Sequence, residues 1–151
     1  MHVTRISAAE TVAIRWPILR PGFPRETAIF NGDDAETTRH FGGFVDGRLV
    51  GVTSIYQMSC PDRPDVPRAW QLRGMATLPE VRGLGVGKAL LAASENAVRN
   101  VGDSLLWCNA RTSAIEFYAR LGWIVSSDEF NIPTVGPHRR MLRVVAPSIP
   151  A

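Results

Sequence analysis

The chain has 151 residues, the size of one globular domain. Hydrophobic residues make up 45% and charged residues 21%, which excludes a disordered chain or a collagen-like fibre, and a scattered net charge of +3 gives no nucleic-acid-binding stripe. No apolar run approaches the roughly 20 residues of a membrane-spanning helix, and Cys60 and Cys108 have no metal or redox spacing. We therefore expect a cytoplasmic protein with no metal, no nucleic-acid partner and no membrane partner.

The first half of the chain predicts a strand, a helix and a hairpin. Residues 2–6 are expected to form a short strand, and Ser7 to cap a helix that runs to about residue 19, with Pro17 kinking or ending it. Residues 40–45 and 49–57 predict a β-hairpin, because the Asp46-Gly47 pair between them suits a type I′ turn.

In the second half, strands and helices alternate. Strands are expected at residues 69–78, 104–109, 123–126 and 141–145. A helix is expected at residues 86–101, with one apolar face formed by Val86, Leu90, Ala93, Ala97 and Val101. A second helix opens with Ser113 and Glu116 at capping-box spacing and is stopped by Gly122. The order favours an α/β fold (α+β mixed sheet) in a single domain over residues 1–146, followed by a frayed tail at 147–151.

A glycine-rich turn leaves the strand at 69–78 and opens the helix at 86–101. Its glycines bring backbone N–H groups close to a ligand, and a helix N-terminus favours a phosphate or pyrophosphate. A nucleotide-triphosphate loop does not fit, because Arg82 and Ala89 stand where glycine and Ser/Thr are needed. A dinucleotide fingerprint also fails, because Lys88 stands where its third glycine belongs. A glycine-rich connection without a ligand remains open.

The turn matches the pattern Arg/Gln-x-x-Gly-x-Gly/Ala and resembles the acyl-CoA pyrophosphate loop of the GNAT superfamily of N-acetyltransferases. The resemblance implies a small single-domain member with a central mixed β-sheet flanked by helices, in which a splayed strand pair holds acetyl-CoA as co-substrate. The cofactor-binding residues that it implies are Met75, Ala76 and Thr77 on the strand and Arg82, Gly83, Leu84, Gly85, Val86, Gly87 and Lys88 in the turn.

A second segment, residues 114–123, is similar to the family's other signature, Ala-x-x-Phe-Tyr-x-x-x-Gly-Phe. In the family the tyrosine protonates the leaving thiolate, so the resemblance implies that Tyr118 is the catalytic general acid. Read from the residues alone, Tyr118 also fits an apolar core stripe with Phe117 and Leu121.

Two departures from the family pattern concern the site. Members commonly carry Asn where this chain has Arg111; Asn109 is a substitute, so either residue is a candidate for cofactor contact. Many members carry a glutamate base on the strand before the turn, but residues 70–73 offer no carboxylate. The general base is therefore not identified.

Acceptor selection is expected in the N-terminal half and the loops. An acidic run could attract a cationic amine or be a solvated loop; it comprises Glu26, Asp33, Asp34 and Glu36. His40 and His138 are each a proton carrier near neutral pH or a structural hydrogen-bonding group. Most of the four tryptophans, and Cys108, are expected in the core.

Three functions compete. The first is an acetyl-CoA-dependent N-acetyltransferase acting on a primary amine of a small molecule or peptide by direct attack. The second is a non-catalytic acyl-CoA-binding or regulatory module, and the third is a phosphate- or nucleic-acid-binding module. The two motifs favour the first, and the sequence is also compatible with a homodimer.

Overall fold

The computed structural model describes residues 1–146, so the tail at 147–151 lies outside the described residues. The chain divides into two compact units, one formed by residues 1–56 and 72–96 and the other by residues 57–71 and those from 97 onward. Within the described residues there are eight strands in a mostly antiparallel sheet and three α-helices. This confirms the mixed α/β class, whereas the single domain stays a prediction.

The first unit is built on an antiparallel meander. Strand β1 (His2–Ile6) pairs with β2 (Arg39–Val45), and β2 pairs with β3 (Arg48–Gln57). Asp46 and Gly47 join β2 to β3 with φ values of 50° and 77°, as a type I′ turn requires. Strand β4 (Ala69–Thr77) follows β3 in the sheet order. The predicted hairpin is therefore confirmed.

Helix α1 (Ala8–Leu19) begins at Ser7, as the sequence predicts. The Ser7 side chain accepts the Glu10 N–H, and the Glu10 carboxylate accepts the Ser7 N–H, which completes a capping box. Pro17 lies inside the helix, which continues to Leu19. Since α1 ends at Leu19, Pro17 lies in its last turn and does not end the helix.

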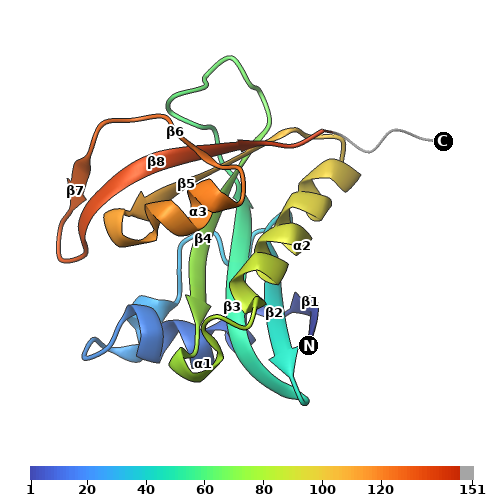
Figure 1. The fold of residues 1–151 in the computed structure, drawn as a ribbon, viewed down its shortest axis with the longest axis vertical. Coiled ribbons are helices and arrows are strands. Elements are labelled where there is room, and N and C mark those ends of the chain that lie inside the picture. The colour runs from blue at the N-terminus through green and yellow to red at the C-terminus, as the bar shows by residue number, and fades with distance from the viewer. Residues whose placement is uncertain (147–151) are drawn as a thin grey trace. The chain divides into compact units, whose positions relative to one another are not determined.

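Two helices cover opposite faces of the strands in this unit (Figure 1). In β3, Val52 packs with Ile14 of α1 in one hydrophobic cluster. The adjacent Gly51 faces helix α2 (Val86–Asn100), because a Cβ there would lie 2.8 Å from Cγ1 of Val86. The missing side chain at Gly51 therefore lets α2 begin directly against the sheet.

The buried face of α2 differs from the predicted one. Val86 and Leu90 are buried, but Ala93 and Ala97 are only half-buried, and Val101 lies beyond the helix and is 48% exposed. The remaining buried positions on this helix are Leu91, Ser94, Glu95 and Val98. The prediction was wrong in its last turns because the buried face passes through Leu91, Ser94 and Val98. Ser94 is buried there with its hydroxyl donating to the Leu90 carbonyl.

The second unit centres on β5 (Leu105–Arg111). It pairs antiparallel with β8 (Gly136–Val144) along its whole length, and the short strands β6 (Ile124–Val125) and β7 (Phe130–Ile132) both pair with β8. The sequence analysis did not predict β7, and it started the last strand at residue 141 because the preceding residues are Pro137, His138 and two arginines.

Strands β4 and β5 pair only briefly. Their parallel register joins Ala69–Gln71 to Leu105–Trp107, which is three residues of a nine-residue and a seven-residue strand. Most of each strand therefore lies outside this pairing. The core beside it contains Cys60, Ala69, Leu105, Trp107 and Leu142.

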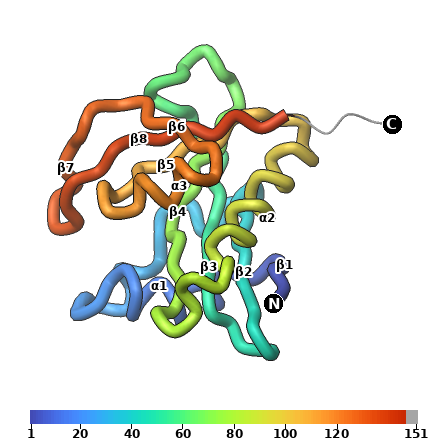
Figure 2. The backbone as a smooth tube through the Cα atoms, viewed as in Figure 1, coloured from blue at the N-terminus to red at the C-terminus, as the bar shows by residue number. Residues whose placement is uncertain are grey.

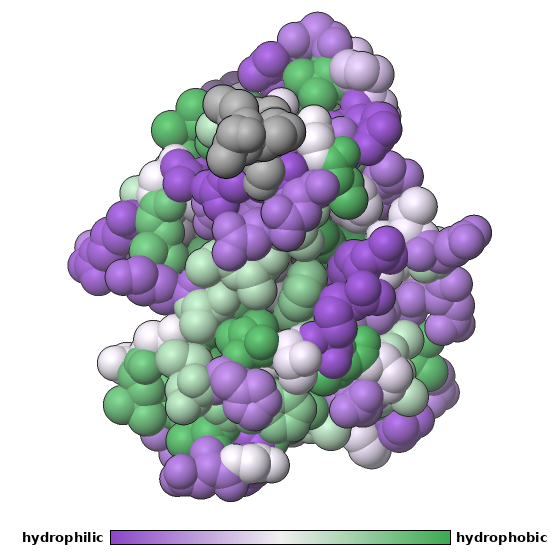
Figure 3. Space-filling model, turned by 90° about the vertical axis from the view of Figure 1, so that its right-hand side faces the viewer, coloured by the Kyte–Doolittle hydropathy of each residue, from purple (hydrophilic) through white to green (hydrophobic). Residues whose placement is uncertain are grey.

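The surface mixes apolar and polar side chains. Trp70, Trp107 and Trp123 are buried as expected, but Trp16 is 39% exposed. On the face shown in Figure 3, hydrophobic areas are separated by hydrophilic ones. Within residues 1–146, no helix combines the length and apolar character needed to cross a membrane.

Candidate active site

The glycine-rich turn projects from the first unit between two buried anchors. The chain leaves β4, passes through a short 3-10 helix (Pro79–Val81) and enters α2, a path that Figure 2 traces. Val81 and Val86 are buried, whereas Leu84 between them is 62% exposed. Gly83 and Gly85 both have a φ of 85°, and no atom lies within 4 Å of where their Cβ atoms would be. The turn therefore presents bare backbone to the surroundings.

The start of α2 adds donors and positive charge to this turn. The Ala89 N–H donates to the Gly85 carbonyl, so the N–H groups just before it stand at the helix N-terminus, where a helix leaves its first donors unpaired. Arg82 and Lys88 are exposed on either side of the turn. Backbone donors, a helix N-terminus and two cations favour an anion such as a pyrophosphate.

The strand before the turn is tied to it through Arg82, whose Nη2 donates to the Thr77 carbonyl at 3.4 Å. Met75 and Thr77 are half-buried, and Ala76 is buried. The structure thus brings the predicted strand residues and the predicted turn residues together in the first unit.

Gly74 interrupts β4 just before these residues. Its φ is 69°, and a Cβ there would lie 3.1 Å from both Arg15 Nε and Phe30 Cε2. A glycine is therefore needed at this position, because the backbone is left-handed and a side chain would crowd Arg15 and Phe30.

Tyr118 lies in the second unit, on the short helix α3 (Ile115–Arg120). It is buried, and its ring lies 5.3 Å from that of Trp123 and 5.2 Å from that of Phe117. Burial, and secondarily the Cys108 thiol, raises the pKa of Tyr118 well above its usual value of 10.0. The phenol is therefore protonated throughout the neutral range.

The start of α3 differs from the prediction. Residues Thr112–Ala114 form a 3-10 turn, Ala114 is the N-cap of α3, and no side chain caps it. The predicted capping box of Ser113 and Glu116 is therefore wrong. Glu116 instead pairs with Arg120 one turn later.

Asn109 carries a buried polar atom without a partner. Its Oδ1 has no hydrogen bond within the described residues, although such atoms are usually paired in folded proteins. Asn109 follows Cys108 in β5, and the Cys108 thiol is near enough to Tyr118 to raise its pKa. Because adjacent side chains of a strand point to opposite faces, Asn109 lies on the face opposite Cys108. Arg111 is exposed at the end of β5. Asn109 thus offers an unpaired acceptor, whereas the exposed Arg111 side chain offers only donors.

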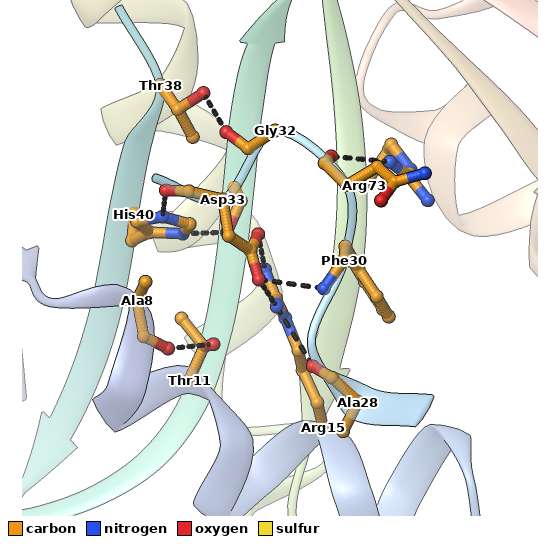
Figure 4. A network of polar contacts seen from close by, with 12 residues as sticks. Ala8, Thr11, Arg15, Ala28, Phe30, Gly32, Asp33, Thr38, His40 and Arg73 are labelled. Carbon is orange, nitrogen blue, oxygen red and sulfur yellow. Dashed lines mark hydrogen bonds and ion pairs between the residues drawn. The ribbon is translucent and has the colours of Figure 1, made fainter. Parts of the chain in front are cut away.

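The acidic run does not form a continuous rim, because Asp33 is buried. Arg15 binds both oxygens of its carboxylate, and the Phe30 N–H donates to it at 2.9 Å (Figure 4). Tyr56 also donates to it, at 2.5 Å. Desolvation raises the pKa of Asp33, but these hydrogen bonds and the Arg15 charge outweigh it and lower the pKa below 3.8. The other members of the run, Glu26, Asp34 and Glu36, are exposed.

His40 and His138 both form hydrogen bonds within the fold. His40 is buried, with Nδ1 2.6 Å from Ser54 Oγ and Nε2 2.9 Å from the Asp33 carbonyl (Figure 4). His138 is buried, and its Nδ1 lies 2.7 Å from the Gly136 carbonyl. Both therefore match the structural alternative. Within residues 1–146 no group of three or more metal-ligating side chains occurs.

The role of Arg15 was not predicted from the sequence. One signal was present: Arg15 follows Val12 by three residues and Thr11 by four, which places it on the buried face of α1. A charged residue on such a face is expected to have a buried partner. The partner, Asp33, lies 18 residues away in a loop.

Comparisons with known proteins identify the family of this chain. A family model described as the acetyltransferase (GNAT) family matches residues 8–123. The uncharacterized N-acetyltransferase YitI of Bacillus subtilis (strain 168) is 36% identical over 148 residues, which cover 98% of this chain and 99% of that protein.

Two solved structures are similar at much lower identity. Escherichia coli ElaA has a TM-score of 0.75 at 18% identity, covering 94% of this chain and 98% of that one. An aminoglycoside 6′-N-acetyltransferase complexed with coenzyme A has a TM-score of 0.75 at 13% identity, covering 99% of this chain and 100% of that one. At such identities the two structures show the shared fold alone.

Proposed function

This chain belongs to the acetyltransferase (GNAT) family, and we propose that it transfers an acetyl group from acetyl-CoA to a primary amine of a small molecule or peptide. The observation that carries the proposal is the exposed turn at Gly83–Gly85, with its bare backbone at the start of α2. A helix N-terminus with free backbone donors favours an anion, and in the family this turn binds the pyrophosphate of acetyl-CoA.

The residues of the first unit fit the cofactor. Backbone N–H groups of the turn would bind the pyrophosphate, with Arg82 and Lys88 adding positive charge. Backbone groups of residues 75–77 would hold the arm that carries the acetyl group. The unpartnered Asn109 Oδ1 in the second unit is an acceptor that a ligand amide can satisfy, which supports a cofactor contact there as well.

Acetyl-CoA supplies an activated thioester, and the chain supplies position and a proton. A neutral amine would attack the acetyl carbonyl directly, and Tyr118 would give its phenolic proton to the sulfur as the C–S bond breaks. The nitrogen would then release its extra proton to solvent, and the Tyr118 phenolate would take one back. Because the pKa of Tyr118 is raised, the phenol carries its proton at neutral pH. A backbone N–H near residues 75–77 would stabilise the carbonyl oxygen as it gains negative charge.

The experiment is an acetyl-transfer assay on purified protein with acetyl-CoA and a panel of polyamines, amino acids and peptide N-termini. The account expects thiol release that depends on the amine, together with a product one acetyl group heavier by mass spectrometry. Tight acetyl-CoA binding with no transfer to any amine would instead favour the non-catalytic binding module.

A further inference from the structure

Three arginine side chains surround one phenylalanine ring in the first unit. The guanidinium carbons of Arg15, Arg73 and Arg20 lie 4.0, 4.9 and 5.3 Å from the centre of the Phe30 ring. Guanidinium groups are attracted to aromatic faces, which explains how three like charges gather there. At Phe30, the Arg73 side chain of β4 thus meets the loop that precedes β2.

The nearby Asp33 carboxylate pairs with Arg15. Both oxygens of Asp33 are bound by Arg15, and Tyr56 and the Phe30 N–H use their remaining capacity. Asp33 is therefore the counter-ion of Arg15, and its hydrogen bonds leave it no capacity to serve Arg73.

Arg73 has few hydrogen bonds for its size. Its Nη1 donates to the Asn31 carbonyl at 3.5 Å, and its guanidinium also lies 5.3 Å from the Tyr56 ring centre. Within the part of the chain that the structure describes, it forms no ion pair with a carboxylate. A guanidinium has five N–H donors, so most of those of Arg73 remain for an outside partner. The residue is half-buried, and it reaches from β4 toward the Phe30 loop (Figure 4).

The position of Arg73 relates it to the proposed transfer site. It precedes Met75 by two residues, so the two Cα atoms are no more than about 7 Å apart. An acceptor whose carboxylate pairs with Arg73 would therefore have its amine near residues 75–77, where the acetyl group is proposed to lie. Planar guanidinium groups match carboxylates in a two-point geometry.

We propose that Arg73 binds a carboxylate of the acceptor, so that the preferred substrate is an amine that carries a carboxylate, such as an amino acid. The proposal rests on the proposed acetyl transfer. Arg73 is then a specificity-determining residue.

The test uses matched acceptors that differ only in the carboxylate: amino acids and the amines left by their decarboxylation. The wild-type protein should favour the carboxylate-bearing member of at least one pair by about tenfold or more in kcat/KM. Arg73→Gln should remove that preference mainly through KM, and Arg73→Lys should restore part of it. Arg48→Gln, which removes an exposed charge from the same unit, should leave the preference unchanged.

Acetyl-CoA affinity separates the outcomes. The account expects the Kd for acetyl-CoA to stay within about twofold in Arg73→Gln. A large loss of affinity would mean that Arg73 holds a phosphate of the cofactor, which overturns the acceptor proposal. Equal activity on both members of every pair would also overturn it while leaving acetyl transfer intact.

If no amine in the panel is acetylated, binding replaces turnover as the readout. N-acetyl amino acids should raise the Tm of the CoA-saturated protein more than the corresponding N-acetyl amines, and Arg73→Gln should abolish the difference. No difference in the wild-type protein would overturn the proposal. Failure to bind acetyl-CoA at all would instead remove the proposed function itself.

Discussion

Arg15 and Asp33 form a two-point ion pair, with Nη1 2.7 Å from Oδ2 and Nη2 3.1 Å from Oδ1, and both side chains are buried. Arg15 also donates to the Ala28 carbonyl, so one side chain of α1 binds the loop before β2 at two points. The loop carries Phe30, which lies against Arg15 and Arg73. The pair therefore holds in place the loop against which Arg73, the residue to which we assign acceptor selection, packs.

Replacing Arg15 by methionine should destabilise the protein strongly. The change keeps an unbranched side chain but leaves the Asp33 carboxylate buried without its cation, which costs about 3–5 kcal/mol. The measurement is urea denaturation followed by tryptophan fluorescence.

The matched control is Arg48→Met, which breaks the exposed pair between Arg48 and Glu80. Surface pairs contribute about 0–1 kcal/mol, so this variant should be close to the wild type. Equal losses in the two variants would contradict the importance of the buried pair.

The regular elements were largely predictable because their signals are local. The Ser7 cap and the Asp46-Gly47 turn each act through neighbouring backbone atoms, and both are confirmed. The capping box predicted at Ser113 failed because a 3-10 turn at residues 112–114 occupies the place of the first helical turn.

The buried polar network was not predictable in the same way. The sequence around Asp33 indicates one member of an acidic run. In the structure Asp33 is buried because it pairs with Arg15, which lies 18 residues earlier in the chain. Likewise, nothing adjacent in the sequence indicates that Asn109 Oδ1 lacks a partner. Long-range contacts decide the electrostatics of the site, whereas the motifs predict only where the site lies.

Asp62 should make stability depend on acid pH. Hydrogen bonds from Arg140 chiefly, and from Ser126, lower the pKa of Asp62 below its ordinary value of 3.8 despite some desolvation. A carboxyl with a lowered pKa in the folded state stabilises it above the ordinary pKa, and the contribution is lost as the pH falls through the folded value.

The measurement is the free energy of unfolding as a function of pH for the wild type and Asp62→Asn. The difference between them should be largest near neutral pH and shrink below about pH 4. Asp34→Asn, at an exposed position, controls for the change in net charge. A difference between wild type and Asp62→Asn that grows on acidification would contradict the direction of the pKa shift.

Gly85→Glu should abolish acetyl-CoA binding, because it places bulk and negative charge where we propose the pyrophosphate binds. The φ of 85° also strains any side chain at this position, so a control with the same strain is needed. Gly102→Glu supplies it, since Gly102 has a φ of 82° and equally open space around its Cβ position. Calorimetry should show lost affinity in the first variant and wild-type affinity in the second; equal affinity in both would remove the turn from the site.

Tyr118→Phe should lower kcat by about 100-fold or more while leaving the Kd for acetyl-CoA nearly unchanged, because it removes a proton donor and keeps the ring against Trp123. Since the pKa of Tyr118 is raised, its ionisation should cause no loss of wild-type turnover below about pH 10. Turnover within about twofold of the wild type would show that Tyr118 is a packing residue alone.

The most direct test of the account is calorimetric titration of the protein with acetyl-CoA, beside thermal-shift measurements with ATP and NAD. The account predicts micromolar binding of acetyl-CoA and no stabilisation by the other two ligands. No binding of acetyl-CoA, together with a clear shift from ATP or NAD, would contradict the assignment of the glycine turn and the acetyl-transfer function built on it.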